Sequence, residues 1–311
     1  VWIKNRGSAN GHVLHDVIRG VTKNLETNST AIENTVDPLS SFDSDGFTLS
    51  GTGGGINGNT ENYASWNWKA GGTASSNTDG TITSSVSANT DSGFSVVTYT
   101  GNATTSQSVG HGLNSVPKMI IVKNRIDASD WKIYHASLGT SYQMLLNNND
   151  AAALAGTLWG STTPTSNLFY INNDGSVNGS GDGMVAYCFA DVKGFSKMGS
   201  YVGNGNADGT FIYTGFSPSF ILFKNSSVTE SWTILDLKRA SVPNANPNAN
   251  VLWPNDNYAE YDETQGIDFL SNGFKVRESA TGFNGSGNQI IYMAFAENPL
   301  VASNYVPTTA R

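Results

Sequence analysis

One pattern of residues occurs three times along this chain at constant spacing, and no other feature restricts the fold as strongly. Each copy has a Lys-Asn pair at the end of an apolar run, and the asparagines are Asn5, Asn124 and Asn225. The seventh residue after each asparagine is His12, Trp131 or Trp232, and the eleventh is Asp16, His135 or Asp236. Repeated spacing of this kind indicates one structural module used more than once.

A second pattern lies further along each copy. The segments INGNTENYASWNWKA, VNGSGDGMVAYCFAD and FNGSGNQIIYMAFAE align without a gap, and each begins with an apolar residue followed by Asn-Gly. The asparagines of these pairs are Asn57, Asn178 and Asn284. Amide side chains can bind sugars, but they also cap turns at strand ends. Because both patterns keep their order in all copies, we interpret the six asparagines as structural anchors of the repeat.

The local pattern is that of short strands. Apolar, β-branched and aromatic residues run or alternate over four to eight positions, bounded by Gly, Asn, Asp and Ser. Asp-Gly in 41–50 and Asn-Gly in 268–277 favour tight hairpins. Only residues 142–156 could form a short helix, and their asparagines weaken that prediction. We predict an all-β chain of three tandem antiparallel β-sandwich modules, each jelly-roll-like.

The two patterns also suggest where the modules begin and end. We predict a first module at 1–70, a linker rich in Gly, Ser and Thr at 71–90, a second module at 91–192 and a third at 193–311. Strand pairs precede the Lys-Asn pattern in the second and third copies, whereas the first copy starts at VWIKN. The first module is therefore expected to lack its N-terminal strands, which would leave an unpaired edge open to a neighbouring chain.

Charge restricts the partners. Charged residues make up 14% of the chain, and the formal net charge is −8 at pH 7. Because affinity for a phosphate backbone comes from clustered Lys and Arg, we expect no nucleic-acid partner. No run of 18 apolar residues is present, so we expect no membrane insertion. The single cysteine, Cys188, lies in an apolar run and is expected to be a buried thiol.

No group of residues in the sequence has the pattern of a catalytic or metal site. Asp16, His135 and Asp236 carry chemistry used in hydrolysis, but they occupy equivalent positions in different modules, which would hold them apart. Their expected role is the same in each copy, a polar end to a strand. The histidines lack metal-ligand spacing, and the glycine-rich stretch 51–58 lacks the βαβ context of a dinucleotide site. We predict no enzyme activity, no cofactor and no metal.

Four aromatic residues lie outside the repeated pattern, in loop-like surroundings: Trp159, Trp253, Tyr258 and Tyr261. An aromatic side chain on a loop can stack on a sugar ring or anchor an interface. We take these four as candidate ligand-binding residues, with simple loop packing as the alternative. Trp131 and Trp232 belong to the repeated pattern and are expected to lie in the core.

The strings WIKNR, SFDSDGFTLSG, SWNWKAGG, YCFADVKGFSKMGSYVGNGNADG, YTGFSPSFILFKN and DFLSNGFKVR together resemble the repeated β-modules of tail-fibre-like and other virion-surface proteins of marine tailed phages, cyanophages among them. The resemblance covers nearly the whole chain. It implies a structural or adhesive role on the virion surface, after synthesis in the host cytoplasm, and it transfers no catalytic residue. The partners it implies are other virion proteins, further copies of the chain in a homo-oligomer, with a trimer favoured, and a host surface glycan.

A tail-fibre or surface adhesion protein that contributes to host attachment is the function this resemblance favours, and two others stay open. A capsid or tail decoration protein would occupy the particle stoichiometrically and bind no host cell. A tail depolymerase would need two carboxylates roughly 5–10 Å apart in a cleft, and it would release reducing ends from host polysaccharide.

Overall fold

Strands make up nearly all of the regular structure. The computed structural model describes residues 1–35, 39–51, 55–240 and 246–297 of the 311-residue chain. Within this part, every pair of named strands is antiparallel, and the helices α1 (Gly175–Asn178) and α2 (Thr281–Asn284) are single turns. The prediction of an all-β antiparallel fold is confirmed.

The first group of strands, called unit one, forms a five-stranded sheet and a hairpin. Its strands are β1 (Trp2–Asn5), β2 (Val13–Leu14), β3 (Lys23–Glu26), β4 (Asn34–Thr35), β5 (Leu39–Phe42), β6 (Phe47–Leu49) and β7 (Tyr63–Trp66). The sheet order is β4-β3-β2-β1-β7, and β5 pairs with β6. The predicted turn in 41–50 is confirmed, because the Asp43 N–H donates to the Gly46 carbonyl.

Unit two has an eight-stranded sheet with the order β15-β14-β13-β12-β17-β10-β9-β8 and a smaller sheet, β11-β16. Its strands are β8 (Ser75–Asn77), β9 (Ser84–Asn89), β10 (Phe94–Thr100), β11 (Gln107–Gly110), β12 (Pro117–Asn124), β13 (Lys132–His135), β14 (Tyr142–Leu145), β15 (Ala153–Leu154), β16 (Leu168–Ile171) and β17 (Gly183–Ala190). A buried apolar cluster that includes Val109, Phe169 and Cys188 belongs to this unit alone.

Unit three has two four-stranded sheets, β18-β25-β20-β21 and β19-β24-β23-β22, around its own buried cluster. Its strands are β18 (Ser196–Val202), β19 (Phe211–Tyr213), β20 (Phe220–Asn225), β21 (Thr233–Asp236), β22 (Asn248–Val251), β23 (Tyr261–Leu270), β24 (Gly273–Val276) and β25 (Gln289–Phe295). The predicted hairpin in 268–277 is confirmed, because Leu270 and Gly273 are paired across the β23–β24 turn.

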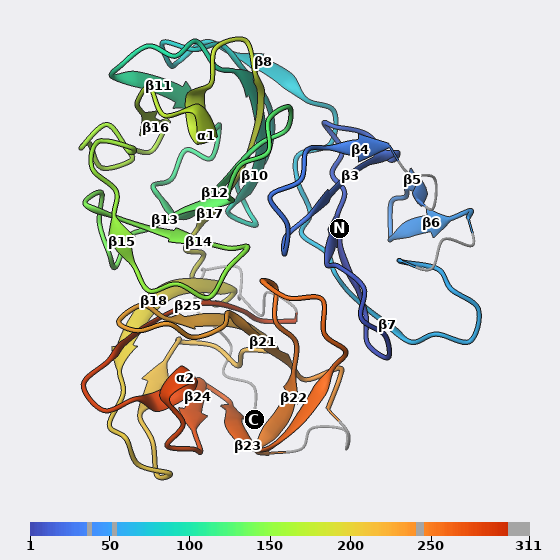
Figure 1. Ribbon diagram of the computed structural model, residues 1–311, viewed down its shortest axis with the longest axis vertical. Helices are drawn as coiled ribbons and strands as arrows, with labels where there is room; N and C mark the ends of the chain where they lie inside the picture. The colour runs from blue at the N-terminus through green and yellow to red at the C-terminus, as the bar shows by residue number, and fades with distance from the viewer. Residues whose placement is uncertain (36–38, 52–54, 241–245, 298–311) are drawn as a thin grey trace.

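The three units repeat one strand order and lie as three lobes around a common centre (Figure 1). The order β2-β1-β7 in unit one corresponds to β13-β12-β17-β10 in unit two and to β21-β20-β25-β18 in unit three. Strands β17 and β25 therefore each lie between two neighbours, whereas β7 pairs only with β1 in the part of the chain that the structure describes. The described part of unit one has no strand in the place of β10 and β18.

The inner strands are apolar on both faces because each face packs against a different core. In β12, Ile120 and Val122 belong to the cluster inside unit two, while Met119 and Ile121 belong to a second cluster. This second cluster, here called the central core, contains residues of all three units. Strands covered on both faces read as nearly continuous apolar runs, which explains MIIV and FILF.

The central core is centred on three aromatic rings from equivalent positions. Trp68, Phe189 and Phe295 follow or end β7, β17 and β25, and they align in the second repeated pattern. The ring centroids lie 5.9 Å apart for Trp68 and Phe189, 5.7 Å for Trp68 and Phe295, and 6.1 Å for Phe189 and Phe295. Each unit thus supplies one ring to a single point, which defines an approximate threefold axis through one chain.

Residues 71–90 are not a linker, contrary to the prediction. Strands β8 and β9 lie in this segment and complete one side of the sheet of unit two. Its Ser-rich composition suits this place, because β8 is an exposed edge and the Ser84 and Ser87 hydroxyls donate to the carbonyls of Gly110 and Gly72. Polar composition alone did not distinguish an edge strand from a loop.

The possible helix in 142–156 is also absent, and β14 and β15 occupy its place. Asn148 of this segment forms a turn instead, because its side-chain oxygen accepts the Asp150 N–H. Asparagine favours such local bonds over helix, which accounts for the difference.

We expect the rings on the threefold axis to stabilise the whole chain together. Phe189→Ala and Phe295→Ala should each lower the free energy of unfolding by about 3–5 kcal/mol, because both rings are buried. The double variant should lose less than the sum by about 0.5–3 kcal/mol, since the rings are in contact. Urea unfolding followed by tryptophan fluorescence measures both quantities.

The control is Phe211→Ala in β19, where the ring is 44% exposed and an effect within about 1 kcal/mol is expected. Additive losses at Phe189 and Phe295, or losses no larger than at Phe211, would contradict a shared central core.

Candidate functional site

Trp159 is a core residue. Its side chain is 2% exposed, packs edge-on against Tyr134 at 6.0 Å between ring centroids, and donates from Nε1 to the Tyr142 carbonyl at 3.2 Å. No face of the ring is free for a ligand. Its interpretation as a ligand-binding loop residue is therefore wrong, and the alternative of loop packing holds for it.

The other three predicted aromatics come together on the surface of unit three. Trp253 lies 6.3 Å from Tyr258 and 6.2 Å from Tyr261, measured between ring centroids. Tyr258 is 61% exposed and Tyr261 is 55% exposed, while Trp253 is half-buried against the core of the unit. We call these three residues the aromatic cluster, and it is the candidate site.

The loop that carries the aromatic cluster joins β22 to β23 and is fixed at several points. The Asn255 side chain accepts the Trp232 N–H at 2.8 Å, and the Asp256 N–H donates to the Trp253 carbonyl at 2.9 Å. The Pro254 carbonyl accepts a bond from the Thr27 hydroxyl of unit one at 2.7 Å. The cluster thus lies beside the contact surface between units three and one.

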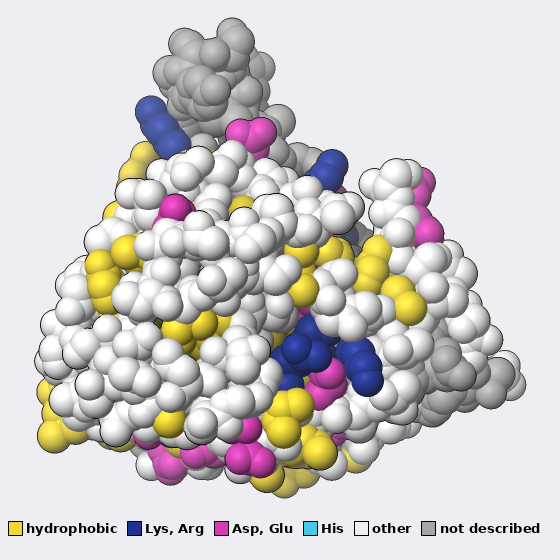
Figure 2. Space-filling model, turned by 90° about the horizontal axis from the view of Figure 1, so that it is seen from above, with side chains coloured by type: hydrophobic (Ala, Val, Ile, Leu, Met, Phe, Trp, Pro, Cys, Tyr) yellow, Lys and Arg dark blue, Asp and Glu magenta, His cyan; other side chains and the backbone are white. Residues whose placement is uncertain are grey.

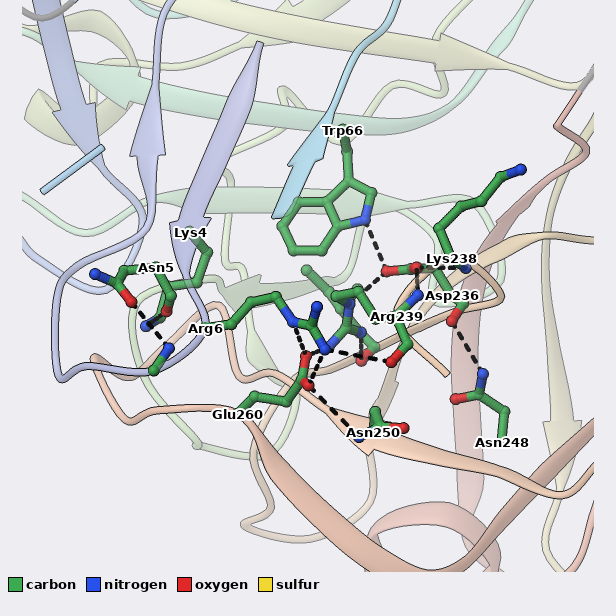
Figure 3. Close-up of polar contacts among 12 residues, drawn as sticks. Lys4, Asn5, Arg6, Trp66, Asp236, Lys238, Arg239, Asn248, Asn250 and Glu260 are labelled. Carbon is green, nitrogen blue, oxygen red and sulfur yellow. Dashed lines mark hydrogen bonds and ion pairs between the residues drawn. The ribbon is translucent and has the colours of Figure 1, made fainter. Parts of the chain in front are cut away.

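A buried carboxylate fixes the far end of the same loop (Figure 3). Both side-chain oxygens of Glu260 accept from the Arg6 guanidinium, at 2.6 and 3.0 Å, and one also accepts from Arg239 at 2.6 Å. The Glu260 N–H donates to the Arg6 carbonyl at 2.8 Å. Because Arg6 belongs to unit one and Arg239 to unit three, Glu260 joins the two units one residue before Tyr261.

Asp236 makes the second contact between these units. Its Oδ2 accepts the Trp66 Nε1–H of unit one at 3.0 Å and the Arg239 Nε–H at 2.6 Å. The Arg239 guanidinium also lies 5.6 Å from the centroid of the Trp66 ring, a cation–π distance. We use the word seam for a contact surface between two units, and this seam combines paired charges with aromatic packing.

The seam between units one and two has the same chemistry at the equivalent positions. Asp16 binds Arg19 and accepts from the Tyr187 hydroxyl of unit two at 2.8 Å. Glu33 pairs with Arg19 and with Arg125 of unit two. Burial acts to raise the pKa of Asp16, but the paired guanidinium of Arg19 holds this pKa below its usual value.

The seam between units two and three is neutral at all of these positions. His135 replaces the aspartate, and one of its ring nitrogens lies 3.3 Å from the Tyr292 carbonyl of unit three. The positions of the two arginines and of the glutamate hold Leu138, Ser226 and Ala152, and the Ala152 N–H still donates to the Ser226 carbonyl at 2.9 Å. Asp16, His135 and Asp236 thus play the same role in three different seams, and the structure does not bring them together.

The first set of predicted anchors caps turns as expected. The side-chain oxygen of Asn124 accepts the N–H groups of Ile126 and Asp127. Asn5 makes the same contacts with the N–H groups of Gly7 and Ser8, and Asn225 makes one with the N–H group of Ser227. Their equivalent surroundings support the repeat.

The second set of anchors makes equivalent contacts in units two and three and a different contact in unit one. Asn178 and Asn284 are fully buried and bind the loops that follow β10 and β18, through Asn102 and Asn204. Asn57 is half-buried and donates to the Gly51 carbonyl instead. Because unit one lacks the strand equivalent to β10 among its described residues, that contact is not available to Asn57.

Each anchor of the first set follows a lysine that is fully buried: Lys4, Lys123 and Lys224. Each ammonium group donates to the carbonyl of the following asparagine, and Lys123 also donates to the Thr30 carbonyl of unit one. Burial lowers the pKa of each of the three side chains from 10.5 to about 8. The lysines lie on the central-core face of their strands and carry charge next to the seams.

The face of the molecule drawn in Figure 2 is mostly uncharged. In Figure 2, white atoms of uncharged polar side chains and backbone predominate, and Lys or Arg atoms gather in one hollow beside Asp or Glu atoms.

Among the described residues, no group of three or more His, Cys, Asp and Glu side chains is placed to hold a metal ion. No helix in the described ranges is long and apolar enough to cross a membrane. Cys188 is buried as predicted, and burial raises its pKa to about 12.

Residues 1–299 match a protein family described as a domain of unknown function (DUF7483). The chain belongs to this family. No curated protein and no solved structure matches it significantly. The match spans all three units.

Reading the sequence missed the seams, although two signals pointed to them. The spacing Asp-x-x-Arg occurs after the first and third anchors, at Asp16 and Arg19 and at Asp236 and Arg239. A lysine inside an apolar strand, repeated in all copies, is the second signal. Buried charges are paired or hydrogen-bonded in proteins, so both patterns indicate buried polar contacts.

We expect Glu260 to hold the aromatic cluster against unit one. Glu260→Gln should lower the free energy of unfolding by about 1.5–3 kcal/mol, because it weakens the charged hydrogen bonds from Arg6 and Arg239 and leaves Arg239 with Asp236 as its charged partner. Glu297→Gln is the matched control, since its pair with Lys238 is 54% and 73% exposed, and less than about 1 kcal/mol is expected. Equal effects of the two variants in urea unfolding would show that the Glu260 network does not join the units.

The buried lysines predict a specific pH dependence. Between pH 8 and 10.5, the unfolded chain keeps the proton of Lys224 and the folded chain releases it, so the stability of the parent rises with pH. The free energy of unfolding of Lys224→Met should therefore exceed that of the parent most below pH 8. Above pH 8 this difference should shrink by up to about 1.4 kcal/mol per pH unit. Urea unfolding at several pH values measures the difference, and Lys238→Met, at an exposed site, is the control.

Proposed function

We propose that this chain is a structural protein of a phage virion surface, a tail-fibre or adhesion protein that contributes to host attachment. The observation that carries the proposal is the aromatic cluster, in which two exposed tyrosines flank a half-buried tryptophan. Aromatic rings with an apolar face and a polar edge suit stacking on sugars, whose rings are apolar on one face and carry hydroxyls at the rim. The resemblance to virion-surface modules of marine phages supplies the biological context.

The placement of the cluster supports recognition. Its loop is fixed by Glu260 at one end and by Asn255 and Pro254 at the other, so little conformational freedom is lost when a ligand binds. The polar side chains that the loop itself carries between Trp253 and Tyr258 are neutral or acidic: Asn255, Asp256 and Asn257. Amides and carboxylates offer hydrogen bonds to sugar hydroxyls, so the ligand class we propose is a neutral surface glycan.

The test is adsorption of the purified chain to host cells and to resistant cells that lack the receptor. Tyr258→Ala and Tyr261→Ala should each weaken adsorption about tenfold or more, equivalent to roughly 1.4 kcal/mol of binding free energy. Tyr213→Ala is the matched control, because Tyr213 is 60% exposed but lies in β19 away from the cluster. All three variants should keep the unfolding midpoint of the parent.

Other outcomes of the same experiment separate the remaining functions. Stoichiometric presence on the particle, with no adsorption of the parent to any cell, would favour a passive decoration protein. Release of reducing ends from host polysaccharide would favour a depolymerase. Adsorption unchanged in both tyrosine variants would show that attachment does not use the aromatic cluster. A homo-oligomer and contacts with other virion proteins stay predictions, to be measured by solution mass.

A further inference from the structure

An open groove of about 360 Å³ lies on the eight-stranded sheet of unit two, on the side where β8 and β10 lie next to unit one (Figure 1). All but two of its lining residues carry a hydroxyl group, and these two are Arg125 and Gly183. The volume is within the range of about 300–1,000 Å³ that ligand sites have, but such sites are usually lined by apolar side chains. A groove of this size with polar walls suits a polar ligand.

Strand register arranges the hydroxyl groups of the floor in two rows. Ser76, Ser85 and Thr98 are paired in turn across β8, β9 and β10, so they lie on one face of the sheet. Thr100 lies two positions after Thr98 and therefore shares this face. It is paired with Gly183 of β17, which leaves a gap in the second row.

The hydroxyl groups of this floor are available to a ligand. Within the part of the chain that the structure describes, the side chains of Ser76, Ser85, Thr98 and Thr100 make no hydrogen bond. By contrast, the hydroxyl of Ser84, on the opposite face of β9, donates to a backbone carbonyl inside the unit. A hydroxyl group can donate one hydrogen bond and accept others, so the floor offers both kinds of contact.

Arg125 supplies a fixed donor at one end of the groove. Its Nε and Nη2 donate to the two side-chain oxygens of Glu33 in unit one, each at 2.8 Å. The remaining nitrogen, Nη1, has no hydrogen bond to any described residue and lies 3.6 Å from the place that a Cβ atom of Gly183 would occupy. Because Glu33 compensates its charge, the guanidinium offers N–H groups without making the groove strongly cationic.

The fold gives no reason for a glycine at position 183. Its backbone lies outside the left-handed region, so a side chain would cause no strain there. The nearest described atoms to its Cβ position, Arg125 Nη1 at 3.6 Å and Ile126 Cγ1 at 3.8 Å, are at ordinary contact distances. Glycine weakens a strand, because it loses the most conformational freedom on folding. Its effect here is to keep the groove open, and a strand glycine often marks close approach of a ligand.

The equivalent place in unit three is filled. Gly183 corresponds to Gln289 in the second repeated pattern, and the Gln289 side chain donates to the Ser200 hydroxyl at 3.4 Å. Strand β18, the equivalent of β10, is the edge of its sheet among the described residues, whereas β9 and β8 continue the sheet beyond β10. Unit two thus differs from unit three by two added strands and by the loss of one side chain, and both differences enlarge the same groove.

We propose that this groove is a second binding site for a neutral glycan chain, held by the hydroxyl groups of the floor and by Nη1 of Arg125. Sugar hydroxyls can donate to and accept from Ser and Thr hydroxyls, and sugar oxygens can accept from the guanidinium. A polyanion is disfavoured, because the one cation of the groove is already paired with Glu33. The inference rests on the proposed function for its ligand class, but the groove shares no residue with the aromatic cluster.

The test measures binding of short neutral hexose oligomers, chosen on an array, by calorimetry. The background is Tyr258→Ala with Tyr261→Ala, which removes the aromatic cluster and leaves the groove. In this background, Gly183→Gln should weaken binding about tenfold or more, because the side chain found in unit three then fills the gap. Thr100→Val removes one hydroxyl and should weaken binding about two- to tenfold.

Ser200→Gln is the matched control, since it adds the same side chain at the exposed position of β18 that corresponds to Thr98. It should bind like the background, and Gly183→Gln should keep or raise the urea midpoint, so that lost binding is not lost folding. Binding unchanged by Gly183→Gln, or no oligomer bound in the background, would overturn the groove. The aromatic cluster is judged separately, by whether the chain with both tyrosines binds more tightly than the background.

Discussion

The contact among Trp68, Phe189 and Phe295 is the interaction on which the rest of the structure depends. It forces the apolar faces of three sheets toward one point, so each unit buries one face of its sheet internally and the other in the central core. Unit one shows why this matters, because the buried residues of its own cluster within the described ranges are Ile3, Val13, Leu39 and Ile56. A unit with so small a core gains most of its stability from its neighbours.

Polar contacts in the seams join the three units, and the residue types at the equivalent positions of a seam differ together from one seam to another. In two seams, the neighbouring unit supplies Tyr187 or Trp66, and each of these side chains can donate a hydrogen bond. The residue that accepts this bond is Asp16 or Asp236, and each aspartate is paired with an arginine. Where the partner position holds Met293, which cannot donate, the residue is His135 and the other charged positions are neutral as well. Such joint replacement leaves none of these aspartate, glutamate and arginine side chains buried without its charged partner, which would be costly.

The sequence allowed the strands and the anchors to be predicted, because both depend on local chemistry. Asn5, Asn124 and Asn225 bond to N–H groups within three residues, so spacing along the chain was enough. The apolar runs around Met119 and Phe220 were predicted only as strands, and the structure shows that these strands are buried on both faces. Edge strands such as β8 were mistaken for a linker because their exposed residues carry no apolar pattern.

The seams could not be predicted in the same way, because they join residues far apart in the chain. Asp16 and Tyr187 are 171 positions apart, and their contact depends on how the units pack. The candidate site shows the same limit, since Trp159 and Trp253 both read as loop tryptophans and only burial separates them. Sequence suggested which residue types recognise a ligand, and the threefold packing decided which of them remain on the surface.

Native-state hydrogen exchange tests the central claim most directly. If one core joins all three units, the amides of Ile3, Ile121 and Leu222, in the equivalent strands β1, β12 and β20, should exchange through one common opening with one free energy. Three separate free energies, with Ile3 exchanging through an opening that leaves Ile121 and Leu222 protected, would contradict it.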